Sequence, residues 1–186
     1  MLDTVKSRVN GLDLNALGEV VEAIEQDASK AKVSFDVTTR WTGQTRSETI
    51  VDGFTIAGER VARSHKIVAD EPCELLGADS APNPQELLMA AVNACMSVGY
   101  AAGAALKGIT LDKLEIRTKG TLDLRGFLGL DDSVPAGYEV VDYEVTIAGN
   151  GTPEQFEEIH QTVMKTSPNY FNLNRPIRMN GSLRVG

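Results

Sequence analysis

The residues best suited to covalent chemistry are two cysteines, Cys73 and Cys95, which lie 22 positions apart in a chain of 186 residues. Their spacing is not that of a metal site such as Cys-x-x-Cys, and the two histidines are far apart in the sequence. No metal centre and no other cofactor are therefore predicted. The cysteines are expected to be either inert core residues or redox-active thiols in a reducing compartment.

Cys95 lies in an apolar stretch, Leu87–Leu106, that contains no charged residue. At helical spacing this stretch has one row of bulky side chains and one row of small ones. The bulky row is Leu88, Val92, Met96 and Tyr100, and the small row is Ala91, Cys95, Gly99 and Gly103. A glycine within a helix costs about 1 kcal/mol relative to alanine. Two glycines in one row therefore indicate that another backbone packs closely, or that space is kept beside the thiol.

Two interpretations of Cys95 follow from the pattern. Free cysteine is among the most buried residue types, so Cys95 can be a small apolar filler. As a reactive thiolate it would need a cationic neighbour such as an arginine, because a position in the middle of a helix lacks the dipole of a helix N-terminus. Cys73 follows Pro72 in a polar loop and is expected to be exposed, without a sign of activation.

The helix that carries Cys95 has clear ends. Asn83-Pro84-Gln85-Glu86 is a capping signature, with Asn as the cap, Pro at the first helical position and Glu three residues after the cap. Gly108 is expected to end the helix after Leu106 or Lys107. A transmembrane span is rejected, since the stretch is built largely from small residues, Ala above all, and also contains Ser and Asn. The prediction is a helix buried on nearly all sides in a soluble core.

The other elements predict an α+β fold. A first helix, capped by Asp13 or Asn15, runs to Glu25 and belongs to an N-terminal helical extension, residues 1–31, which precedes a domain of residues 32–186. The remaining predicted elements are strands at Val33–Val37 and Ser47–Val51, a hairpin turn at Asp52-Gly53, strands at Phe54–Ala57 and Arg63–Ala69, a loop over residues 70–82, strands at Leu114–Leu124 and Val140–Ile147 joined by the Arg125–Gly137 loop, a helix from Thr152, a short helix or turn from Ser167, and a last strand, Ile177–Val185.

Composition excludes some classes of function. The net charge is −8 and no basic run of five residues occurs, which argues against binding to nucleic acid. The first residues, Met1–Lys6, show no basic-then-apolar signal pattern. A cytoplasmic protein without a membrane partner is expected.

Several of these motifs together resemble the OsmC/Ohr family. They are Asp70-Glu71-Pro72, Asn83–Leu88, Ala94-Cys95, Lys107-Gly108-Ile109, Gly137-Tyr138 and Ser167-Pro168. Each motif is weak alone, but their order and spacing are specific, and the resemblance covers roughly residues 33–186. It implies an OsmC-like fold in an intertwined homodimer, with strands wrapped around buried central helices. The sites would lie at the interface, where the partner chain completes them.

The resemblance also assigns roles to residues. Cys95 matches the helix cysteine that attacks a hydroperoxide. The cysteine that resolves the sulfenic acid is replaced by Ser167, which cannot form a disulfide. Arg46 matches the arginine beside the thiolate by position, while the glutamate that pairs with it is replaced by Gln85. Glu86 is adjacent to Gln85 but lies on a different face of the helix.

The preferred function is therefore a thiol-dependent redox protein, a one-cysteine organic hydroperoxide reductase that uses Cys95 and an external thiol. Cys95 is expected to be substantially buried and close to Arg46. One alternative is a catalytically silent protein that binds a small apolar ligand at the dimer interface, and the absence of a resolving cysteine favours it. In a third alternative, Cys73 resolves the sulfenic acid.

Overall fold

The computed structural model describes residues 8–186, so the Met1–Lys6 segment considered above lies outside the described residues. The chain divides into two compact units, and the division falls between Ala90 and Ala91. The elements are a mixture of helices and largely antiparallel strands, which confirms the predicted α+β class.

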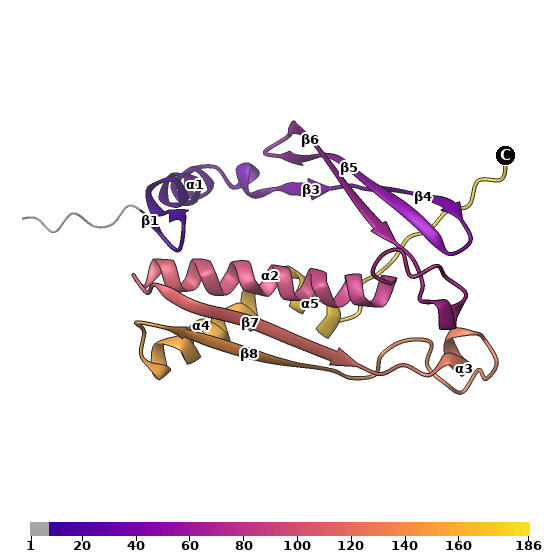
Figure 1. Cartoon of the computed structure of the whole chain (residues 1–186). Helices are drawn as coiled ribbons and strands as arrows, with labels where there is room; N and C mark the ends of the chain where they lie inside the picture. Colours follow the sequence, from indigo (N-terminus) through magenta and orange to yellow (C-terminus); the bar gives the residue numbers. More distant parts are fainter. Residues whose placement is uncertain (1–7) are drawn as a thin grey trace, which may run out of the picture. The chain divides into compact units, whose positions relative to one another are not determined.

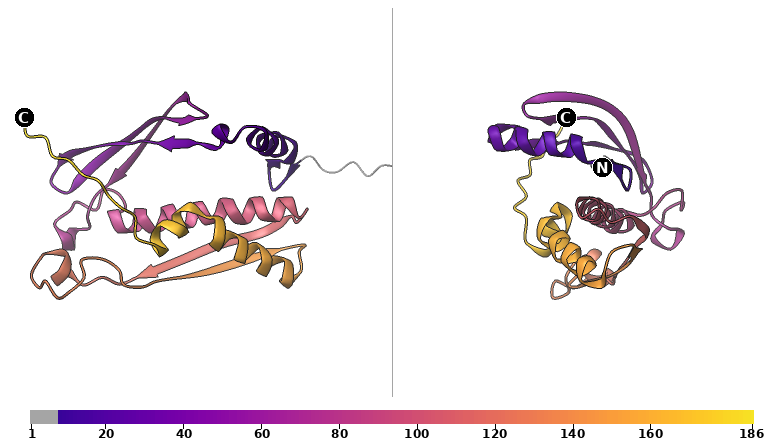
Figure 2. Two further views of the ribbon diagram at one scale, coloured as in Figure 1. Left: turned by 180° about the vertical axis from the view of Figure 1, so that it is seen from behind. Right: turned by 90° about the vertical axis from the view of Figure 1, so that its left-hand side faces the viewer.

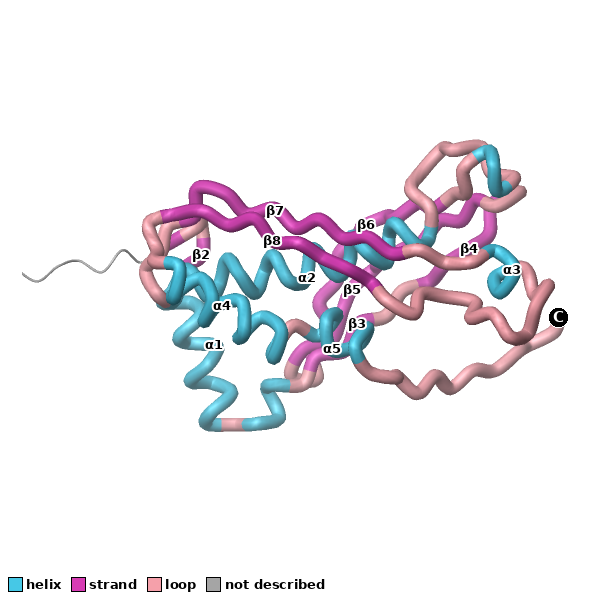
Figure 3. The backbone as a smooth tube through the Cα atoms, turned by 90° about the horizontal axis from the view of Figure 1, so that it is seen from below, coloured by secondary structure: helices cyan, strands magenta, loops and turns pink. Residues whose placement is uncertain are grey.

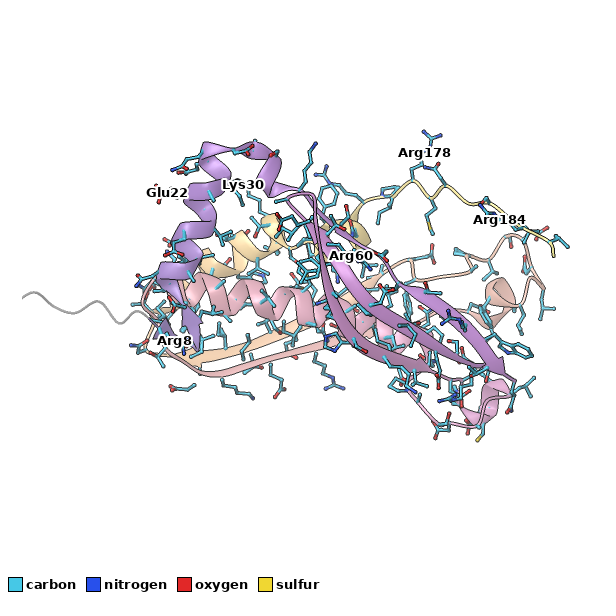
Figure 4. The ribbon with its side chains drawn as sticks, turned by 90° about the horizontal axis from the view of Figure 1, so that it is seen from above. Arg8, Glu22, Lys30, Arg60, Arg178 and Arg184 are labelled. Atoms are coloured by element: carbon cyan, nitrogen blue, oxygen red, sulfur yellow. The ribbon has the colours of Figure 1, made fainter. Side chains whose placement is uncertain are left out.

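The first unit begins with a short hairpin and a helix. Strands β1 (Arg8–Val9) and β2 (Leu12–Asp13) pair, and α1 (Leu14–Gln26) and the 3-10 helix η1 (Ala28–Ala31) follow. The Asp13 carboxylate accepts hydrogen bonds from the backbone N–H groups of Asn15 and Ala16, so Asp13 and not Asn15 caps α1. Arg8, Glu22 and Lys30 mark the hairpin, the helix and η1 in Figure 4, and no residue of α1 is buried.

A four-stranded antiparallel sheet forms most of the first unit. Its strands are β3 (Val33–Phe35), β4 (Thr38–Gly43), β5 (Arg46–Ile56) and β6 (Glu59–Ala69). Strand β5 pairs with each of the other three (Figure 1). Strands β4 and β5 are joined by a turn at Gln44-Thr45, where Gln44 adopts a positive φ.

The predicted hairpin turn at Asp52-Gly53 is wrong. Strand β5 continues through both residues, and its register against β6 shifts between Val51 and Gly53, which is a bulge. A Cβ atom on Gly53 would lie 2.6 Å from the Val61 carbonyl oxygen, so glycine is needed here for close approach of the strands. The chain instead turns at Ala57-Gly58, where both residues have positive φ.

The loop after β6 is organised by one buried carboxylate, Asp70. Its side chain accepts hydrogen bonds from the hydroxyls of Ser80 and Thr45, each at 2.7 Å. It also accepts from the backbone N–H groups of Glu71, Ala78 and Ser80. The hydrogen bonds from Ser80 and then Thr45 hold the pKa of Asp70 well below its usual range. The loop also contains the short 3-10 helix η2 (Cys73–Leu75).

The second unit packs helices against a two-stranded hairpin. Its strands β7 (Leu111–Gly120) and β8 (Val141–Gly149) are antiparallel, and α3 (Leu124–Phe127) lies in the loop between them. Helix α2 (Pro84–Leu106) runs along this hairpin with α4 (Pro153–Thr166) beside it (Figures 1 and 2). The short helix α5 (Pro168–Asn174) follows α4 directly (Figure 3). The core comprises Val92, Met96, Tyr100, Ala104, Ile109, Ile159 and Val163.

The predicted helix ends are confirmed. At the start of α2, Glu86 donates its backbone N–H to the Asn83 side chain, and the Asn83 N–H returns a bond to the Glu86 carboxylate. Gly108 follows the helix with a φ of 69°. At the start of α4, Thr152 and Gln155 form the same reciprocal arrangement.

Within the single chain, α2 is buried on one side, and its burial on nearly all sides stays a prediction for the dimer. Its buried residues are Val92, Met96, Tyr100, Ala104 and Ala105, whereas Val98 and Leu106 are 69% and 67% exposed. The reason is that β7, β8 and α4 cover only one side of it. Among residues 8–186, α2 is the one helix long and apolar enough to span a membrane, a property that core helices of soluble proteins share.

The strand predicted at Ile177–Val185 is also absent from the structure. Residues 175–186 form no helix or strand, and Met179, Leu183 and Val185 are about nine-tenths exposed. Arg178 and Arg184 project from this segment in Figure 4. A strand requires a neighbouring edge that accepts its hydrogen bonds, and the described part of the chain offers this segment no such pairing.

Candidate functional site

The small row of α2 is the surface against which α4 packs. A Cβ atom on Gly99 would lie 3.1 Å from Val163 Cγ2, and one on Gly103 would lie 3.1 Å from Ile159 Cγ2. The later residue on α2, Gly103, meets the earlier residue on α4, Ile159, so the two helices are antiparallel. The glycines are therefore explained by close helix packing, as the row of small residues predicts.

Cys95 occupies the next position in the same row and meets the end of α4. Its partner is Ser167, whose hydroxyl oxygen lies 3.2 Å from Cys95 Sγ. Ser167 is 5% exposed and is both the last cap of α4 and the first cap of α5. Its backbone N–H donates to the Val163 carbonyl at 2.8 Å, so the position of the hydroxyl is set by the backbone of two helices.

The Ser167 hydroxyl takes part in a second hydrogen bond. Ser167 Oγ accepts the backbone N–H of Tyr170 at 3.4 Å. An oxygen that accepts one hydrogen bond still carries its own O–H, which is free to donate to the sulfur. Asn169 steadies the same junction, since its side-chain N–H donates to the Ala91 carbonyl at 2.9 Å. The structure therefore provides Cys95 with a fixed hydrogen-bond donor.

Cys95 is only partly covered within the single chain, and its substantial burial beside a partner chain stays a prediction. The residue is a free thiol. It is partly exposed because Ser167 and the α5 junction cover Cys95 from one side only, in the same way that the core covers only one side of α2.

Arg46 lies at the start of β5 in the first unit. Its guanidinium donates to Glu48 Oε1 at 2.8 Å and to Thr42 Oγ1 at 3.2 Å. Glu48 also contacts Lys66 at 3.4 Å, and these cations hold the pKa of Glu48 below its usual range, with the Arg46 hydrogen bond as the largest cause. Arg46 therefore has a carboxylate partner from its own strand, which sequence reasoning missed.

The residues at the start of α2 differ in their roles. Glu86 forms the reciprocal capping hydrogen bonds with Asn83, so its role is structural. Gln85 is half-buried in the first turn of the helix. It lies ten residues before Cys95, which corresponds to about 15 Å along a helix axis. Cys73 is an exposed free thiol in η2, as expected. Among residues 8–186, no group of three His, Cys, Asp or Glu side chains is arranged to hold a metal ion.

The comparisons with known proteins agree with this architecture. A family model described as OsmC-like protein matches residues 77–181, more than half of the chain. The chain belongs to the OsmC-like family. The match includes the Cys95 helix, the β7–β8 hairpin and the Ser167 junction, which are the elements that build the site.

Solved OsmC-like structures share the fold at low sequence identity. An OsmC-like protein from Mycoplasma pneumoniae is 16% identical, with a TM-score of 0.60 over 76% of this chain and 87% of that chain. An OsmC-like protein of unknown function from Vibrio cholerae is 15% identical, with a TM-score of 0.55 over 74% of this chain and 92% of that chain. No match was found among curated proteins. The resemblance to the family and the OsmC-like fold are thereby confirmed.

Proposed function

We propose that this OsmC-like protein is a one-cysteine organic hydroperoxide reductase that acts through Cys95 and an external thiol. The observation that carries the proposal is the contact between Cys95 Sγ and the Ser167 hydroxyl. The donor is fixed beside the sulfur that would attack the peroxide, and hydrogen bonds to charged acceptors are stronger than those to neutral ones. The thiolate is the form that attacks peroxides.

The reaction proceeds in three balanced steps. The Cys95 thiolate attacks the terminal oxygen of the hydroperoxide, the O–O bond breaks, and the alkoxide takes up a proton and leaves as the alcohol. Cys95 is then a sulfenic acid. One external thiol condenses with it to form a mixed disulfide and water. A second thiol attacks that disulfide, releases the oxidised thiol pair and restores Cys95. Ser167 has no thiol to trap the sulfenic acid, which is why the reductant is external.

Arg46 is the cation that we propose for the reaction at Cys95. A guanidinium beside the sulfur would stabilise the thiolate and the departing oxygen. Glu48 supports this role, because it holds the Arg46 guanidinium at 2.8 Å in the way that a carboxylate at position 85 would. Gln85 is then not required for orientation.

A homodimer is part of the same proposal. Its support is the number of large apolar side chains that the single chain leaves exposed. These include Phe35, Trp41, Val98 and Leu106, which are 67% to 75% exposed, and the C-terminal Met179 and Leu183. A second copy that covers them would remove apolar area from water. It would also offer the C-terminal segment an edge with which to pair.

The test is peroxide consumption with thiol reductants. Cumene hydroperoxide is mixed with the protein and either dithiothreitol or a dihydrolipoyl compound, and wild type is compared with Cys95→Ser and with Cys73→Ser as the matched control. Turnover that is lost in Cys95→Ser and kept in Cys73→Ser supports the proposal. Turnover lost in Cys73→Ser would make Cys73 the resolving residue. A wild-type protein without turnover, and with a thiol that does not react, would support the ligand-binding alternative.

A further inference from the structure

The second unit contains a cavity that does not include Cys95 or Ser167. Its volume is about 550 Å³, and it lies between β8 and α4. One wall is apolar, with Val145 and Ile147 from β8 and Phe156 from α4. The other end is polar and is lined by Tyr100, Tyr143, Glu157 and His160. A mostly apolar concave site with a few convergent polar groups is typical of small-molecule binding.

The polar end has a defined pattern of donors. Tyr100 is 1% exposed, and burial, with smaller effects from Tyr143 and Glu157, raises its pKa well above the usual range, so its hydroxyl keeps its proton. A buried hydroxyl donates its proton to an acceptor. The acceptor that the described residues provide is His160 Nδ1, with which Tyr100 Oη forms a short hydrogen bond. The imidazole proton is therefore on Nε2.

The tautomer leaves one donor for a ligand. His160 lines the cavity, and among the described residues no protein acceptor is found for its Nε2–H. One helical turn earlier, Glu157 also lines the cavity. One of its carboxylate oxygens accepts from Gln161 at 2.7 Å, and residues 8–186 provide no donor to the other. Residues three apart on a helix are neighbours. A donor and an acceptor are therefore adjacent at the polar end of the cavity.

The rings of the cavity favour a flat ligand. Tyr143 lies 6.2 Å from His160 and 6.0 Å from Tyr170, centroid to centroid, so the polar end is walled by aromatic rings. Aromatic rings at such distances attract one another by more than the burial of their surface area accounts for. The Glu157 carboxylate disfavours an anionic ligand, because two like charges would be brought close in a partly desolvated site.

We propose that this cavity is a second ligand site, which binds a small uncharged aromatic compound that carries a hydroxyl group. The ring lies between Val145, Ile147 and Phe156. With Tyr100 as the donor to His160 Nδ1, the ligand hydroxyl accepts from His160 Nε2–H and donates to the Glu157 carboxylate. One hydroxyl satisfies both groups because it is a donor and an acceptor at once. The site is independent of the thiol chemistry at Cys95.

The experiment compares three naphthalene probes of one shape on the full-length protein. They are 2-naphthol, 2-methoxynaphthalene and 2-naphthoate, with binding measured by calorimetry and located by NMR shifts. We expect saturable binding of 2-naphthol with shifts at Tyr143 and Val145. The methoxy compound, which cannot donate to Glu157, should bind about tenfold more weakly. Binding of 2-naphthoate should be weaker still.

Variants test the assigned groups. Glu157→Gln should weaken 2-naphthol and reduce the discrimination against 2-naphthoate, while Glu144→Gln, an exposed acid on β8, serves as the charge-matched control and should change neither. Cys95→Ser should bind 2-naphthol as wild type does, which separates this proposal from the peroxidase. Tyr100→Phe should weaken binding, since the Nε2–H tautomer is no longer enforced. Absence of saturable binding, equal binding of 2-methoxynaphthalene, or shifts confined to other residues would overturn the assignment.

Discussion

Ser167 Oγ lies 3.2 Å from Cys95 Sγ, at the junction of two helices, where the family resemblance places a resolving cysteine. The hydroxyl accepts the backbone N–H of Tyr170 and donates its own proton to the sulfur. A side chain that cannot form a disulfide is thus in contact with the thiol. This contact supplies the most specific prediction.

The substitution Ser167→Cys should restore an internal disulfide. A sulfur in place of Oγ would start within reach of Cys95 Sγ, and a disulfide forms without backbone movement only when the Cα atoms lie within about 7 Å. On addition of cumene hydroperoxide, intact mass should show the loss of two hydrogens, and peptide mapping should join positions 95 and 167.

The matched control is Thr166→Cys, one residue earlier on the exposed side of α4. It should give no disulfide with Cys95. If the two variants form the disulfide equally well, the contact at position 167 is not what directs it.

Gly99 should be intolerant of a side chain. Its added Cβ would lie 3.1 Å from Val163 Cγ2, and Val163 is only 1% exposed, so the side chain has little room to move. Overpacking costs about 1–3 kcal/mol, while alanine in place of glycine within a helix gains up to about 1 kcal/mol. Gly18→Ala in α1 should show only the gain in helix stability, because no atom lies within 4 Å of the added Cβ.

Urea denaturation measures this difference. The free energy of unfolding should be lower for Gly99→Ala than for Gly18→Ala by about 1–3 kcal/mol. The double variant Gly99→Ala with Val163→Ala should lose less stability than the sum of the losses in the two single variants, because the smaller side chain at position 163 makes room for the new methyl group. Equal stability of the two alanine variants would show that the helices do not pack as closely as described.

Asp70 should make the stability of the folded protein depend on pH in the acidic range. Its folded pKa is lowered by the hydrogen bonds from Ser80 and Thr45, so its contribution is fully present above the unfolded value of about 4 and is lost as the pH falls from there toward the folded value. Asp70→Asn should be less stable than wild type at neutral pH, and the gap should narrow below about pH 4. Thermal unfolding across this range, with the exposed Asp79→Asn of the same loop as control, measures it. A gap that does not vary with pH would contradict the assignment.

The protein should be a dimer whose stability depends on its concentration. A second copy would cover the exposed apolar side chains of α2, the sheet and the C-terminal segment, and obligate homodimers often lack a stable folded monomer. Sedimentation velocity should show a dimer at micromolar concentration, and a variant that ends at Arg175 should dissociate at higher concentration than the full chain. A monomer that keeps its full helical signal at low micromolar concentration would contradict this prediction.

The predictions that succeeded rest on local chemistry. Asn83, Glu86 and Gly108 define the ends of α2 because caps and positive φ are properties of a few neighbouring residues. The row of small residues that contains Gly99 likewise indicates that another element packs closely, but it does not show which one. The neighbour, α4, could be identified only from the fold, since the contact joins residues far apart in the chain.

The predictions that failed concern contacts beyond local sequence. Asp52-Gly53 has the composition of a turn, but the Val61 carbonyl on the adjacent strand makes it a bulge. The Ile177–Val185 pattern alternates as a strand does, yet alternation does not supply an edge. The Tyr100–His160 pair was not predicted at all, because a buried tyrosine in a helix row is usually a core residue and the two positions are 60 apart.

The reactivity of Cys95 towards peroxide, and its dependence on Ser167, can be measured directly. Cys73→Ser protein is treated with one equivalent of cumene hydroperoxide in the presence of dimedone, which traps sulfenic acid, and its mass is measured with Ser and with Ala at position 167. We expect one dimedone adduct on Cys95, formed up to about tenfold more slowly in Ser167→Ala because a charged acceptor loses its donor. A Cys95 that stays reduced, or that reacts at the same rate in both proteins, would contradict this expectation.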